Sequence, residues 1–576
     1  MNSRWGRSRP NGDRDRGRYV AGMAEPGPNL PPAETGTGPW SPLRVQLFRS
    51  LWIAGLVSNI GTFMHTVAAG WAITDLTRSP TLVSLVQTAW TVPGFLLALL
   101  AGALADVLDR RRLIIATQFA SMLVAAVLGA FELSHHLTVP LLLLFTFLLS
   151  TAGTMAAPAF MAVTPELVDR SELPKAIGLN SVSTNIAQSA GPALAGIVIA
   201  IAGPGTVFLV NAASFLGIVL VVRRWHPTRD TTLPAEHIGA AMRTGVRYVR
   251  NSPRLQLLAV RLILAITATS ALGALLPIVA RGRLGVSAGQ FGLLSTAMGV
   301  GAVAAVWLLP RLNRIATPDV VVCIAALLWA GGTAVFAIAA ALPLALCGLL
   351  LTGAGTMAVM NVLFSMYTLL LPSWVRGRAS SVAMLTVWLG ASAGAVAWGA
   401  LATTTSARTA LLAAACGHLA VTLLATITLP IGRQEDVDIT QVTWAMPELQ
   451  FPPGEDAGPV LITIDWQIDP STVDAFAAAM IPVRRQRRRD GAYNWGLFHD
   501  LEAPGHMVES YCVSTWSEHE RQHHRSTAAD DLEQSAARAL LVSNETHVHH
   551  HLAPPRPKRS HRAIVSTPDR THLGGP

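Results

Sequence analysis

Gly102-Ala103-Leu104-Ala105-Asp106-Val107-Leu108-Asp109-Arg110-Arg111-Arg112 decides the fold, because this short charged segment separates two long apolar runs. The runs, 81–105 and 113–133, are each long enough to cross a bilayer core, which takes roughly 20 helical residues. We therefore predict that the charged segment is a loop between two membrane helices. Since Lys and Arg beside a membrane span are retained on the cytoplasmic side, we expect this loop in the cytoplasm.

The composition of the whole chain is typical of a protein that crosses the membrane many times. Of its 576 residues, 51% are hydrophobic and only 13% are charged, which excludes an ordinary soluble enzyme. The net charge of +9 is concentrated in short loops and in the two ends of the chain. It indicates basic cytoplasmic segments, and no nucleic-acid partner is expected. The four cysteines lie far apart without a Cys-x-x-Cys pair, so they predict neither a metal site nor a disulfide framework.

Twelve apolar segments predict twelve membrane spans, and hence an all-α polytopic fold in the cell membrane with both termini cytoplasmic. The segments are 50–74, 81–105, 113–133, 138–160, 176–202, 205–222, 255–280, 287–310, 318–340, 343–369, 378–402 and 408–430. With the 102–112 loop in the cytoplasm, most loop arginines fall on that side. The opposite loops hold Arg78, Arg281, Arg283 and Arg408. This asymmetry supports both the number of spans and their orientation.

The longest internal loop divides the spans into two groups of six. Within it, Ala240 to Val249 has apolar residues at helical spacing among arginines, which predicts a basic amphipathic helix on the inner leaflet. The predicted domains are a disordered tail (1–44), a first six-helix half (45–222), a linker (223–254), a second half (255–432), a second linker (433–459), a soluble domain (460–552) and a disordered tail (553–576). Either Met1 or Met23 is the true start.

The pattern Gly-x-x-x-Asp-x-x-x-Arg-Arg between the second and third spans resembles the signature loop of the major facilitator superfamily, which consists of secondary transporters with twelve helices. The resemblance implies that the loop contacts span 11 and stabilises one of two access states. The residues given to this conformational switch are Gly102, Asp106, Arg110, Arg111, Arg376 and Arg378. Val107 and Asp109 stand where the family often has a basic residue and a glycine.

A second motif narrows the resemblance. Gly191-Pro192 in span 5 resembles the glycine-proline motif of the superfamily's drug antiporters, in which proline bends the helix and glycine allows close packing. Together with Ser58 to Thr62, Trp71, Ser79-Pro80 and Leu173 to Asn180, it makes an ordered series. Over roughly residues 45–545, this series is similar to the branch of the enterobactin exporter, the transmembrane secretion effector family.

Polar residues inside the spans are candidates for function, because an ionisable side chain at mid-membrane costs several kcal/mol. His65 either lines a cavity, carries a proton or is structural, and Asn211 either binds substrate or bonds between helices. Asp75 and Glu132 are expected to be solvated helix ends, and Arg261 is expected to snorkel to the inner surface. The candidate cavity residues are Asn59, His65, Trp71 and Gln87.

The soluble domain reads as strands and helices in the order βαββαβ, which is ferredoxin-like. It resembles the dimeric α+β barrels of the antibiotic-biosynthesis monooxygenase type. That resemblance makes Trp495, Trp516, His519 and His523 candidate pocket residues and predicts a homodimer through this domain. A binding or dimerising module is favoured over an enzyme. His547 to His551 reads as an exposed strand without a metal, and no catalytic residue or cofactor is assigned.

The resulting hypothesis is a membrane exporter of small organic molecules, such as a siderophore, drug or natural product. It would work by alternating access of two six-helix halves and by proton antiport. Proton coupling comes from the family resemblance, since the spans carry no acidic residue at mid-membrane. The alternatives are an oxygenase or ligand sensor in the soluble domain, anchored by the spans, and an uptake permease.

Overall fold

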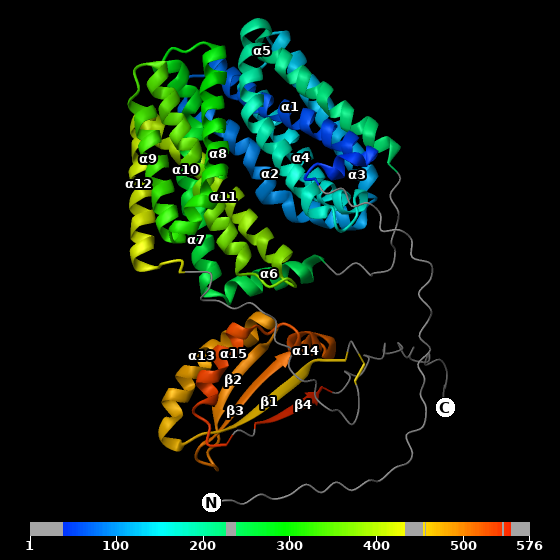
Figure 1. The fold of residues 1–576 in the computed structure, drawn as a ribbon, viewed down its shortest axis with the longest axis vertical. Helices are drawn as coiled ribbons and strands as arrows, with labels where there is room; N and C mark the ends of the chain where they lie inside the picture. Colours follow the sequence, from blue (N-terminus) through cyan, green and yellow to red (C-terminus); the bar gives the residue numbers. More distant parts are fainter. Residues whose placement is uncertain (1–37, 226–237, 433–452, 455–456, 544–545, 554–576) are drawn as a thin grey trace, which may run out of the picture.

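The computed structural model of the chain describes residues 38–225, 238–432, 453–454, 457–543 and 546–553. Two groups of long helices lie side by side, and a small sheet domain lies beyond one end of them (Figure 1). The helices of the first half are α1 (Gln46–Leu76), α2 (Pro80–Val107), α3 (Arg110–Leu133), α4 (Val139–Leu167) and α5 (Leu173–Arg224). Those of the second half are α7 (Pro253–Ile278), α8 (Ala288–Ile315), α9 (Pro318–Ile338), α10 (Leu342–Leu369), α11 (Arg376–Thr404) and α12 (Ala407–Thr428).

Helix α5 accounts for two membrane spans. Among the described residues, eleven helices are long and apolar enough to cross a membrane, and α5 is the longest at 52 residues. Its helical backbone is broken at Gly203, which has a φ of 77° that glycine adopts without strain, and Pro204 follows. The chain thus turns back between 173–202 and 205–224. The predicted total of twelve spans, with separate spans at 176–202 and 205–222, agrees with this break.

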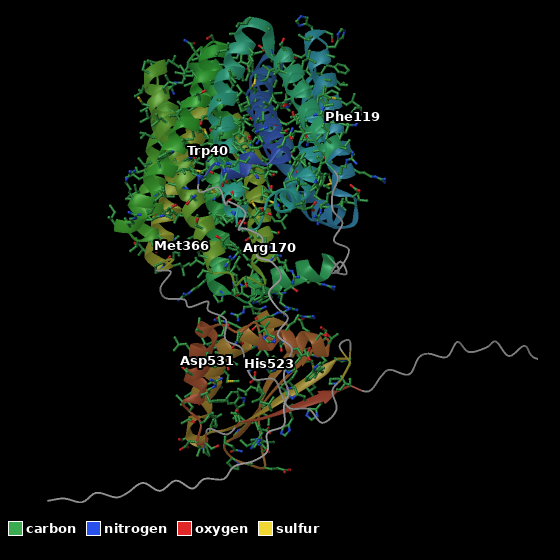
Figure 2. The ribbon with its side chains drawn as sticks, turned by 45° about the vertical axis from the view of Figure 1, so that its right-hand side comes forward. Trp40, Phe119, Arg170, Met366, His523 and Asp531 are labelled. Carbon is green, nitrogen blue, oxygen red and sulfur yellow. The ribbon has the colours of Figure 1, made fainter. Side chains whose placement is uncertain are left out.

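Helix α6 (Ile238–Arg250) lies across one end of the bundle, which we call the linker end. Arg170 and Met366 also lie near this end, as Figure 2 shows. Tyr248 and Val249 are at most 7% exposed, and the Tyr248 ring packs edge-on against Trp374, with 5.6 Å between ring centroids. Of the apolar face predicted to lie on the inner leaflet, Val249 is thus buried with the second half, whereas Val246 is 48% exposed.

The C-terminal domain is a four-stranded antiparallel sheet with helices on one face. The strands β1 (Val460–Gln467), β2 (Tyr493–His499), β3 (His506–Val513) and β4 (His547–Leu552) are ordered β2-β3-β1-β4. Alternate residues of β1, such as Ile462 and Ile464, pack with Phe476 and Met480 of α13 (Val473–Asp490) to form its core. The ferredoxin-like prediction is confirmed, except that the last helix is two: α14 (Trp516–His523) and α15 (Ala528–Arg538).

Candidate substrate cavity

The two halves meet at the end of the bundle opposite the linker end. Thr81 of α2 and Thr403 of α11 place their hydroxyl oxygens 2.7 Å apart there, and deeper in the bundle the hydroxyls of Thr91 and Ser392 are also 2.7 Å apart. Between α5 and α8 the backbones are in direct contact. A Cβ placed on Gly292 would lie 2.6 Å from the Cα of Gly196. Close backbone approach of this kind requires glycine on both helices.

An arginine from the second half reaches over the first half at the same end. Arg281, in the short π-helix η2 (Val279–Arg283), forms an ion pair with Asp75 and donates to the Thr74 hydroxyl over 3.0 Å. Its guanidinium also lies 4.9 Å from the centroid of the Trp71 ring. Asp75, expected to be only a solvated helix end, therefore ties the two halves together.

A cavity of about 510 Å³ lies between the helices of the first half and extends from the middle of the bundle toward the linker end. Its wall includes Phe48 and Trp52 near the start of α1 and Thr164 near the end of α4, which mark that end. The second half contributes Trp388 of α11 to the wall. A Cβ on Gly94 of α2 would come within 2.8 Å of the Trp388 ring, so the indole packs directly on that glycine.

The cavity wall is aromatic and polar but uncharged. Its aromatic residues are Phe48, Trp52, Trp90, Phe160, Phe215 and Trp388, and its polar residues are serines, threonines, asparagines and Gln118. Gln118 is 5% exposed, and its Oε1 has no hydrogen-bond partner among the described residues. A buried acceptor without a partner costs about 1–3 kcal/mol. A donor on a ligand or a water that reached this oxygen would satisfy it.

Of the four candidate cavity residues, the wall includes Asn59. His65 is fully buried behind it, with its ring 4.8 Å from that of Phe208. Trp71 packs on Phe291 and Arg281 where the halves meet, and Gln87 faces Gly273 of α7. The last three lie outside the wall because each is used in packing between helices. Asn211 is likewise buried, against Gly61 at the contact of α1 with α5.

The arginines of the charged loop bind the ends of their own half. Arg110 pairs with Glu166 at the end of α4, and Arg111 donates from Nε to the carbonyl oxygen of Val222 over 3.2 Å. Asp109 caps α3 by accepting from the backbone N–H of Arg112 over 3.0 Å. The Arg111 contact places a cation at a helix C-terminus, the end that favours one. These contacts explain why arginines are stable in the first turn of α3.

The remaining residues of the predicted conformational switch are Gly102, Asp106, Arg376 and Arg378. The side chain of Asp106 lies outside the described residues. A Cβ on Gly102 would meet nothing within 4 Å, so no neighbouring backbone approaches that glycine here. Arg376 donates to the carbonyl oxygen of Leu371 over 3.2 Å, and the backbone of Arg378 contacts Gly245 of α6. The start of α11 is thus joined to the linker.

Gly191 and Pro192 lie where α5 packs against two neighbours. A Cβ on Gly191 would lie 2.6 Å from the Cβ of Phe63 in α1. The carbonyl of Pro192 faces Gly292 of α8 in the other half. The motif therefore provides close packing within the first half and between the halves.

The prediction that Arg261 snorkels to the inner surface is wrong. Arg261 is 7% exposed; its Nη1 lies 3.0 Å from Asp319 Oδ1, and its Nη2 donates to the carbonyl oxygen of Leu429 over 2.6 Å. Asp319 also accepts from the backbone N–H of Ile431 over 2.8 Å. These partners compensate the buried charge, although Nε of Arg261 has no acceptor among the described residues. The pair joins α7, α9 and the chain that leaves α12.

Trp52, Trp90, Gln118 and Trp388 were not predicted to line a cavity, and Asp319 was not predicted to pair with Arg261. The sequence did contain a signal for Asp319. An arginine inside a membrane span needs a counter-charge, and Asp319 lies at the start of another apolar span, 58 residues after Arg261. The aromatic wall residues carried no comparable signal. A tryptophan in a membrane span packs against lipid, helix or cavity with the same local pattern.

The C-terminal domain contains a buried polar cluster but little empty space. A void of about 20 Å³ is lined by residues that include Arg487, Tyr511, His519 and His523. Such a volume is close to that of one water molecule. His519 Nε2 lies 2.9 Å from His550 Nε2 and 3.3 Å from His523 Nε2. Burial, with the nearby His523 and His550, lowers the pKa of His519 to about 3.

In this domain, the two tryptophans predicted to line a pocket donate hydrogen bonds to carboxylates. Trp495 donates from Nε1 to Glu509 over 2.9 Å, and Trp516 donates to Glu520 over 2.7 Å. Within the part of the chain that the structure describes, no group of three or more His, Cys, Asp or Glu side chains is arranged to hold a metal ion.

Comparison with known proteins places this architecture among transporters. Residues 37–558 match the family described as transmembrane secretion effectors. A staphyloferrin A transporter of Staphylococcus aureus is 27% identical over 168 residues, which are 29% of this chain and 42% of that protein. Macrolide efflux protein A of Streptococcus pyogenes is 25% identical over 151 residues, 26% of this chain and 37% of that protein. The matches thus span less than half the length of these relatives.

Among solved structures, a bacterial homologue of the human lysosomal transporter Spinster has a TM-score of 0.54 and 15% sequence identity. The alignment covers 68% of this chain and 98% of that one. At this level of identity, the likeness concerns the fold alone.

Proposed function

The chain belongs to the transmembrane secretion effector family of the major facilitator superfamily, and on that basis we propose that it exports small organic molecules from the cytoplasm by alternating access. The central cavity is the observation that carries the proposal. The contacts between the halves lie at one end, while the cavity extends toward the other. That arrangement suits a transporter that receives its substrate from the linker end.

The linker end is proposed to face the cytoplasm. The arginines of the first charged loop, of α6 and of the start of α11 gather at this end, whereas Arg281, Arg283 and Arg408 lie toward the other. Retention of Arg and Lys on the cytoplasmic side during insertion supports the assignment. Both termini then lie in the cytoplasm, in accord with an even number of spans.

The substrate class follows from the chemistry of the cavity wall. Because no ionisable side chain is among the wall residues, a multiply charged ligand would lose its hydration without gaining a counter-charge. A neutral or singly charged molecule with aromatic or apolar surface suits the six aromatic side chains. The volume of about 510 Å³ lies in the usual range for drug-sized ligands. Relatives named a staphyloferrin A transporter and a macrolide efflux protein are in line with an organic substrate.

The charged loop is proposed to act in the second access state. If the halves rock so that the linker end closes, the end of α2 approaches α11, and Gly102 offers the space for close contact. Asp106 would then meet the start of α11, near Arg376 and Arg378. Arg110 and Arg111 hold the loop to the ends of α4 and α5, so it moves as part of a rigid half. Proton antiport is part of the proposal and rests on family membership.

The proposal is tested by accumulation of a panel of dyes, antibiotics and siderophores in an efflux-deficient host, with and without a protonophore. Gln118→Leu removes the unpaired acceptor from the wall, and Trp388→Ala removes the aromatic residue from the second half. Ser181→Ala is the control, because Ser181 is exposed on the same α5 that supplies wall residues but is not one of them. We expect the native protein and Ser181→Ala to lower accumulation of some compounds, and both wall variants to lose at least fivefold of that effect.

The direction of transport is tested separately in vesicles of known orientation. Outward movement against a gradient supports export, and accumulation in right-side-out vesicles supports uptake instead. If the native protein and all variants, including one ending at Arg433, leave every compound unaffected, the transport proposal fails for this panel. An oxygenase in the C-terminal domain would then be tested by oxygen consumption with phenolic substrates.

A further inference from the structure

A second cavity lies between the linker helix and the C-terminal domain. It has a volume of about 600 Å³ and is bounded on one side by α6 and on the other by the end of α13 and the start of β2. We call it the arginine cleft, after Arg243, Arg247 and Arg250 of α6 and Arg488 of α13, which all line it. Tyr493 and Asn494 complete the side formed by the domain.

The three arginines of α6 share one face of the helix because they are four and three residues apart. The opposite face carries Tyr248 and Val249, which are buried with the second half, and Arg489 of α13 also covers the Tyr248 ring, 5.1 Å from its centroid. The ion pair of Arg247 with Glu518 places this part of the basic face against the domain. Arg488 approaches from the other side of the cleft, so guanidinium groups converge from two separately folded elements.

The part of the cleft wall that the structure describes includes no acidic residue. One described carboxylate, that of Glu518, contacts an arginine of the cleft. Glu518 lies 3.4 Å from Arg247 but also 2.8 Å from Arg525 and 2.9 Å from Arg521, and it is shared among all three. Asp530 pairs with Arg489 over 2.7 Å.

Arg247 carries a donor that needs a partner. Its Nε is buried, and the described residues offer it no hydrogen-bond acceptor. Burial also lowers the pKa of Arg247, which means that the attraction of Glu518 does not compensate fully for the loss of water. An anion bound beside Arg247 would stabilise its guanidinium, and an oxygen that reached this buried N–H would accept from it.

We propose that the arginine cleft binds a multivalent anion of the phosphate type, held between the linker helix and the C-terminal domain. Arginine is suited to this ligand because its planar N–H pairs match two oxygens of one phosphate. The ligand is either a soluble phosphate compound or the headgroup of an anionic lipid, since α6 lies at the end of the membrane bundle. Because the cleft has one wall in each element, the bound anion ties the domain to the second half. This proposal is independent of the transported substrate.

The test uses the full-length protein in a neutral detergent and inorganic pyrophosphate, with binding measured by calorimetry. A parallel arm uses the protein in nanodiscs of phosphatidylcholine, with or without phosphatidylglycerol. Hydrogen exchange is followed in α6 and β2 in both arms. The cleft variant is Arg250→Gln with Arg488→Gln. The matched control is Arg485→Gln, an exposed arginine of the same helix α13 that does not line the cleft.

We expect saturable binding of at least one ligand, a loss of at least tenfold in affinity for the cleft variant, and a change of less than twofold for Arg485→Gln. Pyrophosphate binding identifies a soluble source, and protection only by phosphatidylglycerol identifies a lipid source. Two outcomes overturn the proposal: neither ligand binds saturably, or Arg485→Gln weakens binding as much as the cleft variant does. The cleft variant must keep native exchange in the core strands β1 and β3; if it does not, Arg250→Gln and Arg488→Gln alone are compared with Arg485→Gln.

Discussion

At the scale of single residues, the buried pair of Arg261 and Asp319 is the clearest case of a charge held inside the helix bundle. The Arg261 side chain is 6% exposed and the Asp319 side chain 12% exposed, so neither is strongly screened by solvent. Removing one member of such a pair leaves the other buried and uncompensated, which costs about 3–5 kcal/mol. Replacing both members by apolar residues avoids that cost.

We therefore expect Arg261→Met and Asp319→Leu, each alone, to lower the thermal midpoint of the protein in detergent by several degrees. The double variant is expected to recover most of the loss, because no unpaired charge remains. Fluorescence-detected size exclusion after heating measures the effect. Arg311→Met, which removes an exposed arginine of α8, serves as the control. A double variant as unstable as the worse single one would contradict this account.

At the scale of elements, the crossing of α5 with α8 depends on paired glycines. The Cβ of any larger residue at position 292 would strike the backbone of α5, 2.6 Å from Gly196 Cα. Gly289, one turn earlier on α8, has space, because its Cβ would lie 3.9 Å from the nearest atom. The two positions thus make a matched pair on one helix.

We expect Gly292→Ala to loosen the closed end of the bundle and reduce transport at least tenfold, while Gly289→Ala stays within twofold. Distances between spin labels on the loops at 134–138 and 339–341, one in each half, report the opening. An unchanged distance distribution in Gly292→Ala would show that the backbones adjust without separating the halves.

The contact of α14 with β4 provides a pH dependence within the C-terminal domain. His519 faces His523 on its own helix, His550 of β4 and, at longer range, Arg487 of α13. Its pKa falls from the ordinary 6.5 to about 3, so the folded domain binds fewer protons than the unfolded chain between these values. Stability is therefore fully present above 6.5 and declines as the pH falls, by about 1.4 kcal/mol per pH unit for one such group. Burial lowers the pKa of His550 as well, which adds to the decline.

On lowering the pH from 7.5 to 5.5, we expect faster hydrogen exchange in α14 and β4 of the full-length protein, after correction for the intrinsic rate. His506 acts in the opposite sense, because its hydrogen bond to Asp500 raises its pKa. In His519→Gln the pH dependence of exchange should be shallower, whatever its effect on absolute stability. His524→Gln, at an exposed neighbour, should keep the native slope.

The helices and strands were easier to predict from the sequence than the contacts between residues far apart in the chain. The length of the apolar runs determines the spans, and alternation in Val460 to Gln467 identifies a buried strand, because both depend on neighbours in the chain. Arg261 shows the limit. Whether an arginine one turn into a span reaches water or a carboxylate depends on a helix 58 residues away. In the same way, only the packing of α11 on α2 brings Trp388 to the cavity.

At the scale of the whole molecule, we expect the open face of the sheet to be an interface between two copies of the chain. The helices cover one face, while Leu461, Tyr493 and Phe498 on the other are 38%, 40% and 60% exposed and lie among polar residues such as Thr463 and His549. Exposed aromatic side chains of this kind are enriched at protein interfaces. We expect full-length protein to form a dimer through it.

Phe498→Glu should shift the protein toward the monomer by at least tenfold in dissociation constant, measured by analytical ultracentrifugation or mass photometry in detergent. Leu532→Glu is the control, since Leu532 is 74% exposed on α15, away from the open face. A native protein that is monomeric at micromolar concentration rules out this interface.

The wall of the substrate cavity comes mainly from the first half, and this asymmetry has an evolutionary consequence. Among the described wall residues, the second half contributes Trp388, so we expect the first 225 residues to determine most of the selectivity for the substrate. The second half would then contribute mainly to the conformational change. Gene fragments exchanged near the linker would then transmit cargo preference as a unit. A hybrid that takes residues 1–225 from a relative should acquire the substrate preference of its donor and keep the arginine cleft of its recipient.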